Sequence, residues 1–112
     1  MEKCVELGLT RSIGVSNFNS KQLERLLEAA KIKPVMNQIE VHVNFNQKKL
    51  REFCSKRNIA ITAYSPFGAP GRDSLFQPAG PDIGLKAPEI TEIAKKYNKT
   101  NAQVALRYLV RI

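Results

Sequence analysis

Ile13-Gly14-Val15-Ser16-Asn17-Phe18 is a short apolar run that passes directly into a serine and an asparagine. An apolar strand that ends in polar side chains presents those side chains at one edge of a sheet. Taken alone, the six residues fit equally well a core strand followed by a helix cap or a strand with a binding site at its end. The rest of the chain must decide between these two interpretations.

Two more stretches have the character of strands. Residues 34–41 begin apolar and become polar, whereas residues 59–64 are rich in β-branched side chains and end in Tyr64, followed by Ser65. The three strands start near residues 13, 35 and 59, which lie 22 and 24 residues apart. This spacing is typical of successive βα units with short loops.

The second strand carries three polar side chains, Asn37, Gln38 and Glu40. In a strand that is buried on both faces, each would cost on the order of several kcal/mol without a hydrogen-bond partner. We therefore expect some of them to face a polar site at the carboxyl end of the strand.

The segments around the strands show the 3.6-residue apolar period of helices. Their start and stop residues are those that cap helices well. The predicted helices are residues 1–7 with Gly8 as left-handed cap, Asn19 (with Gln22) to about Lys31, Asn46 to Asn58, Pro88 to Asn98, and 101–112 with Thr100 and Gln103 as its capping box. The loop from Pro66 to Lys86 is long enough to be functional or disordered.

Parallel strands with polar residues at their carboxyl ends are typical of a (β/α)8 barrel or a doubly wound sheet. No Gly-x-Gly-x-x-Gly motif opens a helix, which weakens the dinucleotide-binding doubly wound alternative. We therefore predict an α/β fold, a partial (β/α)8 TIM barrel over residues 1–112. It would hold about three βα units, preceded by a helix end and followed by two late helices, because a complete barrel needs roughly 250 residues.

Composition excludes several classes of protein. The net charge of +8 favours anionic partners, but the basic residues are scattered, so we expect no nucleic-acid partner. No apolar run is long enough for a membrane span and no secretion signal is visible, which predicts a cytoplasmic protein without a membrane partner. The two cysteines, Cys4 and Cys54, suggest neither a metal site nor a disulfide, and we expect both to be reduced core thiols on helices.

Four stretches in family order resemble the aldo-keto reductases. Residues 1–18 are similar to the central signature of that family, with a basic residue at Arg11 before the opening stretch. Asn37-Gln38-Ile39-Glu40 and Ala63-Tyr64-Ser65-Pro66-Phe67-Gly68 match two later landmarks, and residues 98–105 match a late helix. The resemblance covers essentially the whole chain.

The resemblance implies NADPH-dependent reduction of aldehydes or ketones to alcohols, with NADP(H) as cofactor and a small carbonyl compound as substrate. It assigns Ser16, Asn17 and Gln38 to the carboxamide of the nicotinamide. Tyr64 would stack on the nicotinamide ring, and Ser65 and Phe67 would begin the loop over the pyrophosphate. A primary carboxamide has donors and an acceptor, which suits the first three side chains. Gly68 and Gly71 would let backbone N–H groups approach the phosphates.

No catalytic residue is assigned within the chain, because the family's Asp, Tyr, Lys and His lie in the earlier half of the barrel, which has no match here. We therefore expect a fragment that is inactive alone, and a monomer for the full-length protein. The alternative is a non-catalytic cofactor-binding or regulatory member of the same barrel family. Glu40 is expected to be structural and His42 to be a surface or loop residue rather than a general acid.

Overall fold

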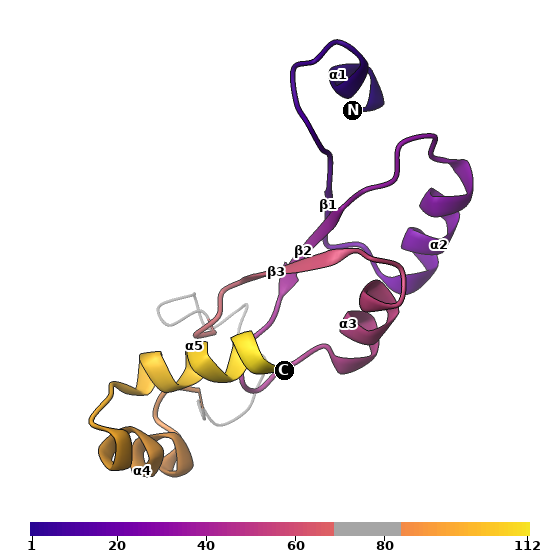
Figure 1. Cartoon of the computed structure of the whole chain (residues 1–112). Helices are drawn as coiled ribbons and strands as arrows, with labels where there is room; N and C mark the ends of the chain where they lie inside the picture. Colours follow the sequence, from indigo (N-terminus) through magenta and orange to yellow (C-terminus); the bar gives the residue numbers. More distant parts are fainter. Residues whose placement is uncertain (69–83) are drawn as a thin grey trace, which may run out of the picture. The chain divides into compact units, whose positions relative to one another are not determined.

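A computed structural model describes residues 1–68 and 84–112 of the chain. Their helices and strands follow the predicted order (Figure 1). The elements are α1 (Glu2–Glu6), β1 (Val15–Ser16), α2 (Ser20–Ala29), β2 (Met36–Glu40), α3 (Lys48–Ser55), β3 (Ala60–Tyr64), α4 (Pro88–Tyr97) and α5 (Asn101–Arg111). The chain divides into unit 1, residues 1–39 and 47–64, and unit 2, residues 40–46 and 65–112, which are described separately.

Unit 1 is built on a three-stranded sheet in the order β1-β2-β3. β1 and β2 pair in parallel, with Val15 opposite Asn37 and Ser16 opposite Gln38. β1 is only two residues long and begins later than the predicted strand, although the Ile13 carbonyl still accepts a hydrogen bond from the backbone N–H of the residue before β2, at 2.9 Å. Parallel pairing in this register places the carboxyl ends of the strands at one edge.

The core of unit 1 lies between the sheet and the helices α2 and α3, which pack against each other on one side of it (Figure 1). Its centre consists of three side chains that are at most 3% exposed: Leu23, Cys54 and Ile59. Partly buried apolar side chains surround this centre, namely Val15, Phe18, Leu27, Leu50, Phe53 and Ile61. The apolar faces predicted for both helices are therefore confirmed as their core-facing sides.

The local cap signals are largely confirmed. Asn19 with Gln22 and Thr100 with Gln103 form complete capping boxes, each with both reciprocal hydrogen bonds. The prediction that Asn46 caps α3 is wrong, because the N-cap is Gln47. Gln47 has a left-handed backbone (φ 52°), and its side chain makes no cap hydrogen bond. An N-cap side chain reaches the first free N–H groups from an extended backbone, which this conformation does not provide.

Cys54 is a fully buried thiol of α3, as predicted, but the prediction that Cys4 lies in a core is wrong. α1 is five residues long and buries none of them, so no neighbouring surface covers Cys4. Both cysteines are free. Burial raises the pKa of the Cys54 thiol above its ordinary value of 9.0, and this outweighs the lowering effects of a hydrogen bond with Asn37 and of the charge of Arg57.

We expect iodoacetamide to modify one cysteine in the native chain and two after unfolding in urea. Cys4 is exposed, whereas Cys54 is buried and its thiol is held in the unreactive protonated form. Mass spectrometry of the modified chain at pH 8 provides the count, and Cys4→Ser should give no modification before unfolding. Equal modification of both thiols in the native chain would contradict the burial of Cys54.

The pKa of Cys54 also affects the stability of the fold. Because the folded-state pKa of Cys54 is raised, its contribution to stability is present below pH 9.0 and is lost as the pH rises further.

Unit 2 contains α4 and α5, which pack against each other. α4 begins with Pro88 at its first turn, and its C-cap is Asn98, whose backbone is left-handed (φ 50°), as predicted. The side chain of Asn101 ties the start of α5 to the segment before α4, because its Nδ2 donates to the Leu85 carbonyl and, at 3.0 Å, to Thr91 Oγ1. Every helix in the described ranges falls short of the length and apolar character that a bilayer crossing requires.

Candidate functional site

The carboxyl ends of the three strands bring four predicted site residues together in unit 1: Ser16, Asn17, Gln38 and Tyr64. Ser16 Oγ donates to the Gln38 carbonyl at 3.0 Å, and Asn17 Nδ2 donates to Ser16 Oγ at 3.1 Å. Tyr64 Oη, from the end of β3, donates to Asn17 Oδ1 at 2.9 Å. The three strand ends are therefore joined by one continuous run of hydrogen bonds, which we call the strand-end network.

The backbone of Asn17 leaves the extended conformation at the end of β1. Its φ is 58°, and its N–H donates to the Gln38 carbonyl at 2.9 Å. Asparagine tolerates this left-handed conformation better than most residues do. The turn directs the chain from the sheet edge into α2 and holds the Asn17 amide within reach of both neighbouring strands.

β2 directs Gln38 and Asn37 to opposite faces of the sheet, as the two-residue period of a strand requires. The Gln38 side chain is exposed and makes no hydrogen bond to any described residue. The side chain of Asn37 is fully buried on the helical side. Within residues 1–68 and 84–112, Gln38 is thus the member of the network whose side-chain amide has no partner, which leaves it available to a ligand.

Asn37 supports the site from the buried face of the sheet, a role that the sequence analysis did not assign to it. Its Nδ2 donates to the Phe18 carbonyl at 2.9 Å, and its Oδ1 accepts from the Phe18 N–H at 3.4 Å. These two bonds hold the backbone immediately after Asn17. A polar residue at position 37, within a buried strand, indicated that its side chain has a hydrogen-bond partner. The sequence did not indicate on which face of the sheet the Asn37 amide lies.

Ser65 and Phe67 lie in unit 2, directly after β3 in the chain. Ser65 has φ 49°, and its carbonyl accepts a hydrogen bond from the Gly68 N–H at 2.9 Å. Gly68 has φ 75°, a conformation that glycine adopts without strain. The two residues thus begin and occupy a tight turn, whereas Gly71 lies outside the described residues.

Glu40 and His42 form a loose pair in unit 2, with 3.9 Å between Oε1 and Nε2. His42 stands in a short antiparallel bridge with Phe45, and its side chain is 20% exposed. The expected loop position of His42 is confirmed, although its side chain is largely covered. Neither residue belongs to the strand-end network.

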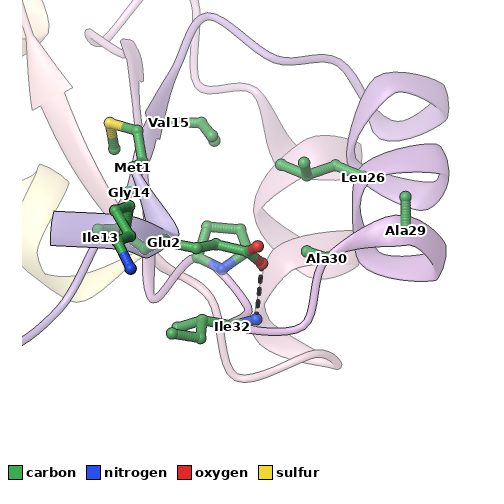
Figure 2. A pocket seen from close by; sticks show the side chains of 11 residues that line it. Met1, Glu2, Ile13, Gly14, Val15, Leu26, Ala29, Ala30 and Ile32 are labelled. Carbon is green, nitrogen blue, oxygen red and sulfur yellow. Dashed lines mark hydrogen bonds between the residues drawn. The ribbon is translucent and has the colours of Figure 1, made fainter. Parts of the chain in front are cut away.

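An open groove of about 480 Å³ lies elsewhere in unit 1, beside α1 and the start of β1 (Figure 2). Its wall includes Ile13 and Leu26, and the Glu2 carboxylate accepts a hydrogen bond from the Ile32 N–H there at 2.8 Å. This hydrogen bond already uses the carboxylate, and the other lining side chains are mostly apolar. None of the residues of the strand-end network lines this groove, so the groove and the polar cluster are separate.

Comparison with known proteins relates this chain to enzymes of one family. A sequence model described as the Aldo/keto reductase family matches residues 1–111. The chain is 49% identical over 109 residues to a (1S)-1,7-diacetoxy-luvungin A aldo-keto reductase of Citrus sinensis, covering 97% of this chain and 33% of the relative. It is 47% identical to dihydrodiol dehydrogenase 3 of Bos taurus, covering 99% of this chain and 35% of that protein.

The same relationship holds in three dimensions. The crystal structure of a Bombyx mori aldo-keto reductase in complex with NADP matches at 44% identity and a TM-score of 0.86, covering 99% of this chain and 36% of the other. The aldose reductase of Schistosoma japonicum matches with a TM-score of 0.84 at 42% identity, covering 99% and 32% of the two chains. The sheet and its helices are therefore part of a TIM barrel, as predicted, and the chain spans about a third of the length of these relatives. The chain belongs to the aldo/keto reductase family.

Proposed function

We propose that this chain supplies the nicotinamide side of the cofactor site in an NADPH-dependent reductase of aldehydes and ketones. The observation that carries the proposal is the strand-end network, in which Ser16, Asn17 and Tyr64 are hydrogen-bonded at one edge beside the exposed amide of Gln38. The relative from Bombyx mori was crystallised with NADP, which supports the choice of cofactor.

The hydrogen-bonding groups left over in the network fit a primary carboxamide. Asn17 Nδ2 carries two protons and donates one of them to Ser16, so one N–H remains for a ligand oxygen. Ser16 Oγ donates once and accepts once within the network, so one lone pair remains for a ligand N–H. The Gln38 amide offers both a donor and an acceptor. A carboxamide presents the complementary set, two N–H donors and one carbonyl oxygen.

The remaining assignments follow the chain beyond β3. The hydroxyl of Tyr64 is held at the network, and we propose that the face of its ring stacks on the planar nicotinamide ring. The turn of Ser65 to Gly68 has the tight backbone that lets N–H groups approach a phosphate closely. We propose that Ser65 and Phe67 line the start of the pyrophosphate-binding segment.

The bound nicotinamide supplies the hydride that reduces the carbonyl carbon. The residues of this chain would fix which ring face points toward the substrate, because three hydrogen-bonding side chains leave the carboxamide a single orientation. None of these residues is assigned as the proton donor to the carbonyl oxygen. In this proposal the donor belongs to the part of the relatives that this chain does not match.

Replacing Asn17 by glycine should weaken NADPH binding to the 112-residue chain about fivefold. Glycine keeps the left-handed backbone but removes the amide that donates to the ligand, and a hydrogen bond of this kind is worth about 1 kcal/mol. NADPH fluorescence on titration with the chain measures the dissociation constant. The matched control is Asn58→Gly, because Asn58 has the same conformation (φ 56°) and lies outside the network. Equal affinities for Asn17→Gly and Asn58→Gly would contradict the assignment.

The second candidate is a non-catalytic member of the family that binds cofactor without turnover. All the residues assigned here position a cofactor, which both functions require. An assay of the complete protein distinguishes the two functions. Oxidation of NADPH with a small aldehyde supports the reductase. Binding of NADPH without oxidation supports the non-catalytic protein.

A further inference from the structure

We propose that a groove lined by α4 and α5 in unit 2 binds a medium-chain fatty acid, with the carboxylate on Arg107 and the alkyl chain over Ile93 and Tyr97. This groove, which we call the α4–α5 groove, has a volume of about 560 Å³. It is lined by Ile93, Tyr97, Lys99, Gln103, Val104 and Arg107. None of these residues belongs to the strand-end network, and the inference does not rest on the proposed function.

The wall of the α4–α5 groove includes apolar side chains that stay exposed although α4 and α5 pack against each other (Figure 1). Ile93 and Tyr97 stand four residues apart on α4, so they share one face of that helix. Ile93 is 45% exposed and Tyr97 is 62% exposed, and Val104 of α5 lines the same groove. An alkyl chain over these side chains would remove apolar surface from water, which favours binding.

Two cations line the α4–α5 groove, and neither has an ionic partner within residues 1–68 and 84–112. Lys99 and Arg107 make no ion pair in this part of the chain, and no acidic residue lines the groove. Gln103 stands between them in the sequence, and its Oε1 already accepts the Thr100 N–H at 2.9 Å. The groove therefore offers two positive charges to an anion without a competing carboxylate in its wall.

A helix end accounts for only one of these two charges. Lys99 follows the C-cap of α4, where a cation complements the partial negative charge of the last carbonyls. Arg107 lies inside α5, whose last turn has a cation of its own, Arg111. A planar guanidinium can bind a carboxylate through two parallel hydrogen bonds. We therefore place the carboxylate of the ligand on Arg107.

Size and charge favour a small carboxylate over a macromolecule in the α4–α5 groove. Its volume of about 560 Å³ is within the range of small-molecule sites, roughly 300–1,000 Å³. A bound peptide helix presents apolar anchors over about two turns, whereas Ile93 and Tyr97 span about one turn of α4. A second copy of the chain would bring a net charge of +8 to a groove that is itself cationic.

The experiment follows the backbone amide signals of the isotope-labelled chain by NMR during titration with octanoate, octanol and acetate. Octanoate should give saturable shifts at Tyr97 and Val104, and it should bind at least about fivefold more tightly than octanol, which lacks the charge. Acetate lacks the alkyl chain and should give no saturable shift. Absence of saturation by octanoate, or saturation by acetate at the same concentrations, would overturn the proposal.

Two variants test the carboxylate contact. In Arg107→Gln the preference for octanoate over octanol should fall to about twofold or less. Arg25→Gln is the matched control, because it removes the same charge from an exposed position of α2 and should keep the wild-type preference. An equal loss of preference in both variants would reduce the binding to attraction by the net charge and would overturn the proposal.

Two further variants test the alkyl contact. Ile93→Gln should weaken octanoate and octanol alike, each about threefold. Leu106→Gln is the matched control, because Leu106 is 43% exposed against 45% for Ile93 and does not line the groove. It should leave both affinities unchanged, and equal effects of the two variants would contradict the placement of the chain. Shifts at Tyr97 and Val104 on raising the protein concentration without ligand would show a second copy in the groove, which would also overturn the proposal.

Discussion

Replacement of Gly14 by valine is expected to lower the free energy of unfolding of the chain by about 3 kcal/mol, the upper part of the range for overpacking a close contact. A Cβ atom at this position would lie 2.9 Å from the Met36 carbonyl oxygen and 3.3 Å from Met36 Cβ. The oxygen belongs to the backbone of β2, so no rotamer change relieves the contact. Urea unfolding followed by far-UV circular dichroism provides the measurement.

The effect should extend from the sheet to the network, because Gly14 directly precedes the paired residues Val15 and Ser16. The matched control is Gly8→Asn, where a Cβ meets nothing within 4 Å and asparagine tolerates the left-handed backbone of φ +69°. The control should stay within about 1 kcal/mol of the wild-type chain. Similar losses for both variants would mean that close approach of β1 and β2 is not the reason for glycine at position 14.

Features that depend on neighbouring residues in the sequence were predictable. The capping boxes of Asn19 and Thr100 each need only a partner three residues away, and both form. The failed cap at Asn46 has an equally local cause, the left-handed backbone of Gln47, but asparagine and glutamine in succession do not indicate which of them takes that conformation. The prediction that Cys4 is buried failed because burial depends on a neighbouring surface that covers the helix, and the sequence of a short helix does not specify one.

The candidate site was predictable to the level of which side chains meet. Polar residues at the ends of parallel strands must share one edge, and Ser16, Asn17 and Tyr64 do so. The direction of their hydrogen bonds could not be predicted, because serine and tyrosine hydroxyls both donate and accept. The burial of Asn37 could not be predicted either. The strand period places Asn37 and Gln38 on opposite faces, but both are amides, and only packing decides which faces the helices.

Replacement of Asn37 by leucine is expected to destabilise the chain by about 3 kcal/mol, although leucine is apolar and of similar size. The side chain is fully buried, and it bonds both the N–H and the carbonyl of Phe18. Leucine would leave both backbone groups without their partner, at about 1–3 kcal/mol for each group that stays buried. The backbone after Asn17 would also lose its support, so NADPH affinity should fall in parallel with the free energy of unfolding, measured by fluorescence titration and urea unfolding.

The variant Asn37→Asp separates the hydrogen bonds from simple packing. Aspartate can still accept from the Phe18 N–H, but as a carboxylate it cannot donate to the Phe18 carbonyl, and it carries a charge into a buried position. Burial raises the folded-state pKa of such a carboxyl above the ordinary value of about 3.9. The protonated acid can donate again, so stability should be recovered at low pH and lost as the pH rises through the raised pKa. The stability of Asn37→Leu relative to the wild-type chain should not change over that range. If Asn37→Asp showed the same flat pH response, the amide would be filling space beside Phe18, and its two hydrogen bonds would not be what supports the candidate site.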